Sequence, residues 1–345
     1  MNKIVYPPSA VLELTYRCNH QCLFCSCPWD APNSSYSKGT ELSISQWKDV
    51  VTKLYSMGVQ SFSMSGGEVL LKQGFDDLIK HIHREGLKRG INNPIFLISN
   101  GLAMKEDYLL LFKKNNVHLS MSLPGLSTFK EHTKIDNAEG VLHWFEKAHE
   151  LGLETTVNIT VTKKNYKELY ETVSSGLLSG ATSVLINRFL PGGRGLFYMH
   201  ELMLSTDEIN GMLDTVEEIL SLSNRYGNLG TEVAYCAIKH PNKYKHLSIG
   251  YQCAAAKGFF VIDPSGQIRT CNHSPHIVGH ILQDEIISDI HYWNIFANRN
   301  YQPTICKHCR HNVICDCGCR EVSHILNGLP NEVDDSIISS RHGMK

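Results

Sequence analysis

Three cysteines near the N-terminus have the spacing of a metal-binding loop. Cys18, Cys22 and Cys25 lie within eight residues, directly after an apolar segment at residues 10–16. Thiolates are soft ligands, and three on one loop could hold three irons of a cubic iron–sulfur cluster. Because such a cluster normally takes four ligands from protein, its fourth iron would be open to a substrate or cofactor. A zinc site completed by a distant residue, or buried thiols without metal, is the alternative.

The other cysteines gather in the last third of the chain. Of the twelve cysteines, four lie at residues 18–27 and eight at residues 236–319. Clustered cysteines in a protein of this size indicate metal binding, because a reducing cytosol disfavours disulfides. The candidate ligands in this second group are Cys253, Cys271, Cys306, Cys309, Cys315, Cys317 and Cys319. For the closely spaced cysteines at residues 306–319, a four-cysteine zinc site is the alternative.

The composition excludes several classes of protein. Hydrophobic residues make up 42% and charged residues 19% of the chain, which is ordinary for a globular protein. A formal net charge of -1 argues against a basic nucleic-acid-binding surface and against docking on anionic membranes. No apolar run approaches the roughly 20 residues that span a bilayer, and the N-terminus is not a signal peptide. We therefore expect a cytoplasmic protein whose partners include neither nucleic acid nor membrane.

Alternating strands and helices must position the first cysteine loop. Strand-like runs follow the segment at residues 10–16, and helical periodicity fills the intervals between them. The strand-like runs are residues 60–64, 95–98, 117–121, 155–161 and 182–186, and the helical segments include residues 43–57, 75–89, 141–151 and 166–178. This alternation predicts an α/β fold with a parallel sheet, open or curled into a partial barrel. In folds of this kind the active and binding sites lie at the carboxyl ends of the parallel strands. The Cys18 loop follows the first strand, so we expect it at this edge.

Breaks in the pattern suggest three regions. A Pro-Gly-Gly turn at residues 191–193 closes the strand–helix region, and a long amphipathic helix follows at about residues 206–225. Two short runs, residues 259–262 and 267–269, are typical of a β-hairpin. We expect a core at residues 1–204, a helical bridge at 205–245, and a small cysteine-rich α+β domain at 246–345.

The first cysteine loop, with Phe24 directly before Cys25, resembles the signature of the radical S-adenosylmethionine (SAM) superfamily. Further residues that match the superfamily pattern lie at or near the carboxyl ends of the predicted strands. The resemblance implies that SAM is bound by Phe24, Gly66, Gly67, Glu68, Ser99, Asn100, Ser122, Lys134 and Asn158. Glu68 would meet the amino group of SAM, and Lys134 falls near where related enzymes often have an arginine.

That resemblance also implies the fold and the chemistry. The fold would be a partial (β/α)6 barrel, with Cys18, Cys22 and Cys25 holding a [4Fe–4S] cluster. The open iron would chelate SAM, and one electron would cleave it to methionine and a 5′-deoxyadenosyl radical able to abstract hydrogen. An electron donor such as a flavodoxin or ferredoxin would be a partner.

The second cysteine group resembles a SPASM-type domain, which holds one or two auxiliary iron–sulfur clusters in peptide-modifying enzymes. The resemblance assigns Cys253, Cys271 and Cys319 to the first auxiliary cluster, and Cys306, Cys309 and Cys315 to the second. The family pattern ends with a seventh cysteine downstream, and residues 320–345 contain none. Cys317, Asp334 or Asp335 could replace it, or only one auxiliary cluster forms.

The resemblance implies a maturase that acts on a ribosomally made peptide. It would abstract a Cα or Cβ hydrogen and leave either a crosslink or an epimerised residue. Crosslinking removes electrons from the substrate, which an auxiliary cluster could accept. Epimerisation needs a hydrogen-atom donor, and Cys236 is the candidate catalytic residue for that step. A buried structural thiol is the alternative for Cys236.

Other functions stay open at this point. A radical SAM enzyme could act on a small molecule or on a folded protein, as in sulfatase maturation. A non-catalytic iron–sulfur or zinc scaffold would bind no SAM. Many crosslinking maturases carry an N-terminal leader-peptide-binding domain, whereas here the first strand begins near Ala10. We therefore expect a separate leader-binding protein, a catalytic domain that holds the peptide unaided, or a substrate without a long leader.

Overall fold

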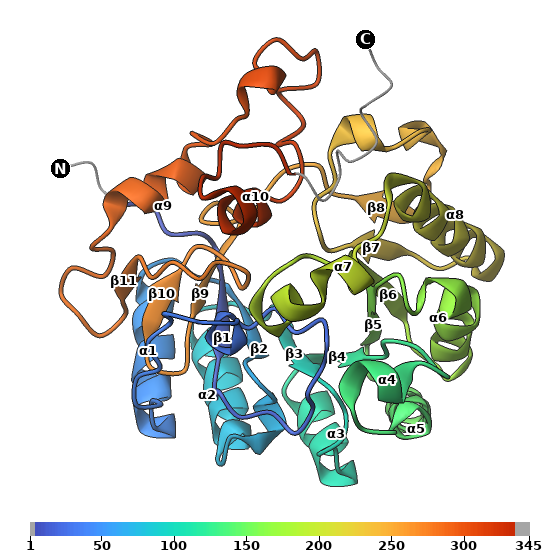
Figure 1. The fold of residues 1–345 in the computed structure, drawn as a ribbon. Helices are drawn as coiled ribbons and strands as arrows, with labels where there is room; N and C mark the ends of the chain where they lie inside the picture. The colour runs from blue at the N-terminus through green and yellow to red at the C-terminus, as the bar shows by residue number, and fades with distance from the viewer. Residues whose placement is uncertain (1–3, 335–345) are drawn as a thin grey trace.

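The computed structural model describes residues 4–334, which form one curved sheet of eleven strands with helices outside it (Figure 1). The strand order is β11-β10-β9-β1-β2-β3-β4-β5-β6-β7-β8. The strands are β1 (Ser9–Glu13), β2 (Ser61–Ser65), β3 (Ile95–Ser99), β4 (Val117–Ser122), β5 (Thr155–Val161), β6 (Ser183–Arg188), β7 (Gly227–Leu229), β8 (Leu247–Ile249), β9 (Phe259–Ile262), β10 (Gln267–Arg269) and β11 (Gly279–His280).

Helices connect most of these strands. The α-helices are α1 (Ile44–Ser56), α2 (Phe75–Lys88), α3 (Glu106–Lys114), α4 (Phe129–Thr133), α5 (Ala138–Glu150), α6 (Leu169–Leu178), α7 (Met199–Leu202), α8 (Thr206–Ser223), α9 (Ile290–Ala297) and α10 (Arg320–Asn327). Short 3-10 helices are η1 (Pro28–Asp30), η2 (Val69–Leu71), η3 (Tyr166–Glu168), η4 (Gly193–Tyr198), η5 (Tyr235–Ala237), η6 (Pro241–Lys243) and η7 (Thr304–Cys306).

Strands β1 to β6 are all parallel and alternate with helices. Figure 1 shows α1, α2, α3, α5 and α6 along the outer side of the curved sheet. This arrangement confirms the predicted partial (β/α)6 barrel. The carboxyl ends of the parallel strands meet at one edge, where the loops after β1, β2, β3 and β4 converge.

Local sequence encodes where two of the longer helices begin. Ser43 Oγ accepts the N–H of Gln46, and the Gln46 side chain accepts the N–H of Ser43, so a capping box starts α1. Ser205 and Glu208 form the same box at the start of α8. Such reciprocal bonds satisfy backbone donors that would otherwise lack partners in the first helical turn.

The C-terminal region shares its sheet with the N-terminal region. The predicted hairpin is present as β9 and β10, and β9 pairs in parallel with β1, with Ala10 opposite Phe260. Strand β11 continues this edge, while α9 and α10 lie with long loops beside the sheet (Figure 1). From β9 onward, the chain segment expected to form a separate domain therefore extends the sheet on the side of β1.

The other edge of the sheet is extended by two strands that the sequence analysis does not predict. The segment expected to be a helical bridge contains α8 and then β7, and β8 follows shortly after it. Strand β7 pairs with β6, and β8 pairs with β7, both in parallel. Each of these strands has three residues, which is too short to show a hydrophobic alternation.

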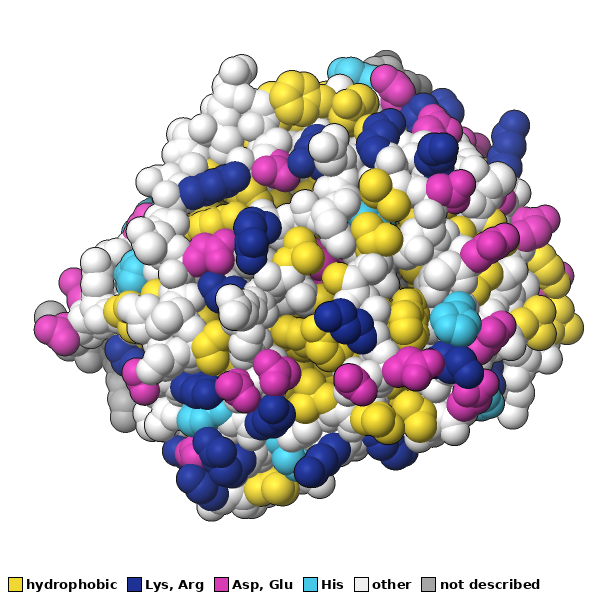
Figure 2. Space-filling model, turned by 90° about the horizontal axis from the view of Figure 1, so that it is seen from below, with side chains coloured by type: hydrophobic (Ala, Val, Ile, Leu, Met, Phe, Trp, Pro, Cys, Tyr) yellow, Lys and Arg dark blue, Asp and Glu magenta, His cyan; other side chains and the backbone are white. Residues whose placement is uncertain are grey.

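Charged side chains are mixed on the surface. Figure 2 shows basic and acidic side chains interspersed on the face seen from below, in keeping with the small net charge. None of the helices within residues 4–334 combines the length and the apolar character needed to cross a lipid bilayer.

Two apolar clusters hold the site elements. The main core joins the sheet to its helices and includes Trp47, Phe112 and Phe145, all fully buried. A second, small cluster joins Leu23 of the cysteine loop to Phe189 and Leu202. The cysteine loop is therefore packed against the segment around η4 and α7 through its own apolar side chain.

A buried ion pair joins the two regions across β1 and β10. The Arg269 guanidinium bonds the Glu13 carboxylate, and neither side chain is exposed by more than 5%. Arg269 also donates to the carbonyl oxygens of Asn272 and Ser274, each at 2.9 Å. Breaking one partner of such a pair leaves an uncompensated charge in the core.

We predict that Arg269→Ala lowers the free energy of unfolding by about 3–5 kcal/mol, because Glu13 then remains buried without its partner. Denaturant unfolding of the metal-free chain would measure the change. Replacing both residues, as Arg269→Met with Glu13→Leu, should recover most of the loss. As a control, Lys80→Ala breaks an exposed pair with Asp76 and should cost less than about 1 kcal/mol. An equal effect of Lys80→Ala and Arg269→Ala would contradict this account.

Candidate functional site

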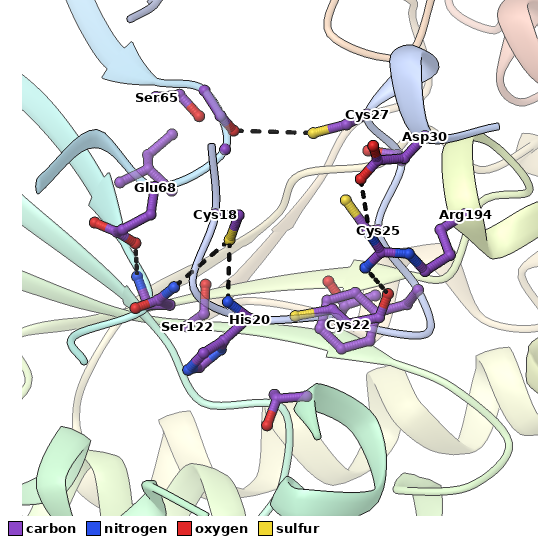
Figure 3. Close-up of a pocket in the computed structure, with 18 of the residues that line it drawn as sticks. Cys18, His20, Cys22, Cys25, Cys27, Asp30, Ser65, Glu68, Ser122 and Arg194 are labelled. Carbon is purple, nitrogen blue, oxygen red and sulfur yellow. Dashed lines mark hydrogen bonds and ion pairs between the residues drawn. The ribbon is translucent and has the colours of Figure 1, made fainter. Parts of the chain in front are cut away.

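The predicted N-terminal ligands surround one cavity at the carboxyl edge of the sheet. Figure 3 shows the sulfurs of Cys18, Cys22 and Cys25 facing a common space. The cavity is lined by these cysteines and by Phe24, Gly66, Gly67, Glu68, Ser99, Asn100 and Ser122, among others. The loops after β1, β2 and β3 and the end of β4 thus bring together most residues that the sequence analysis assigns to SAM and its cluster.

The Gly66-Gly67 turn packs directly on the main chain of the cysteine loop. A Cβ on Gly67 would lie 2.2 Å from the carbonyl oxygen of Arg17, and one on Gly66 would lie 2.8 Å from that of Thr15. The N–H of Gly67 donates to Thr15 O, and the N–H of Glu68 donates to Arg17 O, both at 2.8 Å. The absence of a side chain at these two glycines therefore allows the main chain of the cysteine loop to pack against the turn.

Glu68 is buried, and its carboxylate is held by three donors. Its Oε1 accepts from Ser99 Oγ at 2.8 Å and from the N–H of Leu70 at 3.1 Å. Its Oε2 accepts from the N–H of Asn100 at 2.8 Å. Burial raises the pKa of Glu68 above its usual value, and these hydrogen bonds oppose that rise. The arrangement presents a fixed carboxylate on the cavity wall, which suits a bound ammonium group.

Hydrogen bonds converge on the sulfur of Cys18. The N–H of His20 donates to Cys18 Sγ at 3.4 Å, and Asn100 Nδ2 lies 3.9 Å from the same sulfur. Asn100 also donates to Asn19 Oδ1 at 2.7 Å, which ties the loop after β3 to the cysteine loop. Burial raises the pKa of Cys18 to about 11 in the metal-free chain. A bound metal would be needed to stabilise the thiolate there.

His20 is a residue of this site that the sequence analysis did not single out. It lines the cavity, and its Nε2 is buried without a hydrogen-bond partner among the described residues. Burial lowers the pKa of His20 to about 4, so the ring is neutral at neutral pH. An unsatisfied buried ring nitrogen fits a cavity built to hold a polar group. The only available signal was its position between Cys18 and Cys22.

Arg194 anchors the far side of the cysteine loop. Its guanidinium donates to Asp30 Oδ2 at 2.8 Å and to the carbonyl oxygen of Cys22 at 3.4 Å (Figure 3). Cys27, in the same loop, lies with its Sγ 3.9 Å from Gly66 O. A hydrogen bond from Cys27 lowers the pKa of Cys25, against the effect of burial. Both residues therefore shape the loop around the three ligand candidates.

A second cavity adjoins the first and contains the first auxiliary group. Cys253, Cys271 and Cys319 are buried and line it together, and Phe24 lines both cavities. Burial raises the pKa of Cys253 well above its usual value, and the neighbouring Glu232, Cys271 and Cys319 add to that effect. The three thiols that the sequence analysis assigns to one cluster thus lie together, facing the cavity.

The remaining cysteines form a third group outside both cavities. Cys306 and Cys317 are hydrogen-bonded through their side chains, and the N–H of Cys317 donates to Cys315 Sγ at 3.3 Å. The N–H of Cys309 donates to Cys306 O at 3.1 Å, which closes the turn between these two ligand candidates. Cys236 also belongs to this neighbourhood and lines neither cavity.

A buried carboxylate joins the second and third groups. Asp316 lies between Cys315 and Cys317 in the chain and is 1% exposed. Its Oδ2 accepts the N–H of Cys253 at 2.8 Å and the hydroxyl of Tyr301 at 2.9 Å. Its other oxygen binds the Arg299 guanidinium. Asp316 therefore links the loop that carries Cys315 and Cys317 to the main chain at Cys253.

Two of the residues assigned to SAM lie away from the first cavity. Lys134 is exposed, and its Nζ donates to Glu131 O at 3.0 Å, so the structure does not bring it to the site. Asn158 lines the second cavity, where its Oδ1 accepts from Asn187 Nδ2 at 2.9 Å. Its position suits a substrate at least as well as SAM.

Of the two acidic candidates for the missing seventh ligand, the structure describes Asp334. Asp334 is buried, and its Oδ2 accepts from Arg188 and from the N–H of Cys319, at 2.7 and 2.8 Å. It is therefore committed to an ion pair with Arg188 near the first auxiliary group. Asp335 lies outside the described residues.

The spacing of the thiols bears on the kind of metal group. Within residues 4–334, no three His, Cys, Asp or Glu side chains converge closely enough to hold a single metal ion. A cubic cluster takes each thiolate on a separate iron, so its ligands stand wider apart than those of one ion. A lone zinc needs its sulfurs at about 2.3 Å from one centre. Three thiolates on one loop suit the cubic cluster that the sequence resemblance implies, because each can bind a separate iron.

We predict that Gly67→Ala displaces the cysteine loop, because the new Cβ would overlap the main chain of Arg17. The free energy of unfolding should fall by about 1–3 kcal/mol, and the iron held by the N-terminal cysteines should be lost on gel filtration. Gly250→Ala is the control, since a Cβ there meets nothing within 4 Å. Parent-like stability and iron content in Gly67→Ala would contradict the close packing described here.

Comparisons with known proteins agree with this geometry. The PqqA peptide cyclase of Bradyrhizobium diazoefficiens is 25% identical over 344 residues, covering 93% of this chain and 83% of that protein. The PqqA peptide cyclase of Rhodopseudomonas palustris is 25% identical over 340 residues, covering 93% and 84%. The fold resembles that of Streptococcus suis SuiB bound to precursor peptide SuiA, with a TM-score of 0.75, 17% identity, and coverage of 97% of this chain and 76% of that chain.

A further solved structure and a family model complete the comparison. The structure of anSMEcpe with bound AdoMet superposes with a TM-score of 0.69 and 17% identity, covering 96% of this chain and 92% of that chain. The sequence model of the Radical SAM superfamily matches residues 12–175, which contain the cysteine loop and the Gly66-Gly67-Glu68 turn. Residues 12–175 of this chain are therefore a radical SAM domain.

Proposed function

We propose that this chain is a radical SAM enzyme that modifies a peptide. The observation that carries the proposal is the cavity in which three cysteine sulfurs face the buried carboxylate of Glu68, directly beside a second, cysteine-lined cavity. When bound, a reduced [4Fe–4S] cluster supplies the electron that cleaves SAM to methionine and a 5′-deoxyadenosyl radical, which takes hydrogen from the substrate. A radical SAM domain over residues 12–175 supports this chemistry.

The chain's own residues would bind and orient SAM. Cys18, Cys22 and Cys25 would hold three irons and leave the fourth open. Glu68 would accept hydrogen bonds from the ammonium group of SAM, in a position fixed by Ser99 and the N–H of Asn100. The turn at Gly66 and Gly67 would hold that carboxylate at a constant distance from the cysteine loop. Ser122 and Phe24 would complete the wall.

The second cavity supplies groups that suit a peptide. Its wall carries amide and hydroxyl side chains, including Asn158, Asn187 and Thr231, which can pair with backbone N–H and C=O groups of an extended peptide. Because this cavity shares Phe24 and Thr160 with the first, a peptide there would reach the place where SAM is cleaved. The relatives named PqqA peptide cyclase and the SuiB structure with a precursor peptide support this substrate class.

Bond formation within the peptide is favoured over epimerisation. Cys236, the candidate hydrogen-atom donor, lines neither cavity, which supports a role other than quenching a substrate radical there. The name of the relatives, peptide cyclase, points in the same direction. Cys253, Cys271 and Cys319 would hold an auxiliary cluster beside the substrate, and the group at residues 306–317 would hold a second one.

The remaining partners follow from this chemistry. A small redox protein such as a flavodoxin or ferredoxin would supply the electron, and a separate protein could present the leader of the peptide. The cytoplasm is the expected location, since iron–sulfur ligands must stay reduced.

We predict that Cys22→Ala abolishes the formation of 5′-deoxyadenosine by the anaerobically reconstituted, reduced enzyme, because one of three iron ligands is lost. Chromatography of the quenched reaction would measure the nucleoside. Ser34→Ala, on an exposed part of the same loop, is the control and should keep the activity. Continued 5′-deoxyadenosine formation by Cys22→Ala would contradict the proposed cluster site.

A second prediction tests the substrate class. A short precursor peptide encoded beside this gene, incubated with enzyme, SAM and reductant, should lose two hydrogens for each crosslink formed. Tandem mass spectrometry would detect both the loss and the fragments that fail to separate. A product of unchanged mass that contains a D-residue would instead indicate epimerisation, and cleavage of SAM without any change in the peptide would contradict a peptide substrate.

A further inference from the structure

Cys236 lies on the third cysteine group, although it comes from a distant part of the chain. It belongs to the 3-10 helix η5 (Tyr235–Ala237), which follows β7, about 70 residues before Cys306. Its side chain is exposed, so it does not serve the apolar core. Packing in the core therefore does not explain the Cys236 thiol, and the residues around it indicate its role.

The turn that carries Cys236 is attached to the loop of the third group. The N–H of Tyr235 donates to Cys315 Sγ at 3.3 Å. The ring of Tyr235 stacks on His311, with centroids 4.1 Å apart and an interplanar angle of 27°. It also contacts Tyr251, whose carbonyl oxygen accepts the N–H of Asp316 at 2.8 Å. The position of Cys236 is thus fixed relative to the loop.

The sulfur of Cys315 has the surroundings of a cluster ligand. Two backbone N–H groups, of Tyr235 and Cys317, donate to it, each at 3.3 Å. N–H donors of this kind stabilise cluster thiolates and tune their potential. Burial raises the pKa of Cys315, and the nearby Cys236 and Cys306 add to the rise.

Cys306, Cys309 and Cys315 are one ligand short of the four that a cubic iron–sulfur cluster normally takes from protein. Downstream of Cys319 the sequence has no cysteine. Asp334 is occupied by Arg188 and by the N–H of Cys319, on the side of the first auxiliary group. Cys317 is buried, with a left-handed backbone (φ 59°), and its side chain is bonded to Cys306. Among the thiols of the group that the structure describes, Cys236 is the one that is exposed.

We propose that Cys236 is the fourth protein ligand of the second auxiliary iron–sulfur cluster, together with Cys306, Cys309 and Cys315. The ligand would come from upstream of the cysteine-rich region, in place of a downstream seventh cysteine. The proposal rests on the auxiliary clusters of the proposed function, and it requires neither SAM cleavage nor a particular substrate. It replaces the catalytic role considered for Cys236.

The test uses the full chain without its SAM cluster. A parent variant carrying Cys18→Ala, Cys22→Ala and Cys25→Ala, reconstituted anaerobically, should bind about eight irons in two clusters. Adding Cys236→Ala should remove up to about four irons, or change the EPR spectrum of one reduced cluster while the other stays as in the parent. Adding Cys236→Ser should retain the iron with a shifted reduction potential, because a serine oxygen can replace the sulfur.

Two further variants separate Cys236 from its neighbours. Cys317→Ala should keep the iron content and spectrum of the parent, and Cys27→Ala, which removes a thiol far from the group, should do so as well. Parent-like iron and EPR spectra in Cys236→Ala would overturn the proposal, as would loss of the cluster in Cys317→Ala alone. A parent variant without iron would overturn the auxiliary clusters and this inference, whereas the Cys22→Ala experiment tests SAM cleavage independently.

Discussion

The site depends on a contact between two pieces of main chain. The turn after β2 presses its glycines against the carbonyl groups of Thr15 and Arg17, and two hydrogen bonds of 2.8 Å close the contact. No side chain longer than hydrogen fits there. The contact fixes the start of the cysteine loop and, on the same turn, the carboxylate of Glu68. The proposed iron ligands and the proposed SAM-binding carboxylate are therefore positioned by one main-chain contact rather than by two independent loops.

Strand β1 is the place where the two halves of the chain meet. It pairs with β2 on one side and with β9 on the other, and both pairings are parallel. The cysteine loop leaves its carboxyl end, and Cys271 lies just beyond β10 in the neighbouring hairpin. The buried pair of Glu13 and Arg269 locks these elements together. This pairing explains how two cysteine groups far apart in sequence line adjoining cavities.

Local signals in the sequence predicted most of the barrel. The runs at β1 to β6 and the hairpin of β9 and β10 depend on residues close in sequence, and the structure confirms them. The three N-terminal thiols and the turn at Glu68 could be predicted to share a site because parallel strands end at one edge.

Contacts between residues far apart in the chain could not be predicted from the sequence. Nothing local indicates that β9 adds to β1, or that three-residue strands such as β7 complete the other edge. The neighbours of Cys236 could not be predicted either, because they lie about 70 positions further along the chain. The adjacent Tyr235 contacts them by stacking on His311. Lys134 was assigned by its place in the chain, and the left-handed end of α4 directs it to solvent.

The brace formed by Asp316 has a consequence for electron flow. Its carboxylate holds the main chain at Cys253 and sits between Cys315 and Cys317, with Arg299 and Tyr301 closing the contact. A rigid link of this kind would keep the two proposed auxiliary clusters at one separation, whatever a peptide in the adjoining cavity does. Because tunnelling rates fall steeply with distance, such a link would make the exchange of electrons between the centres insensitive to motions of the surrounding loops.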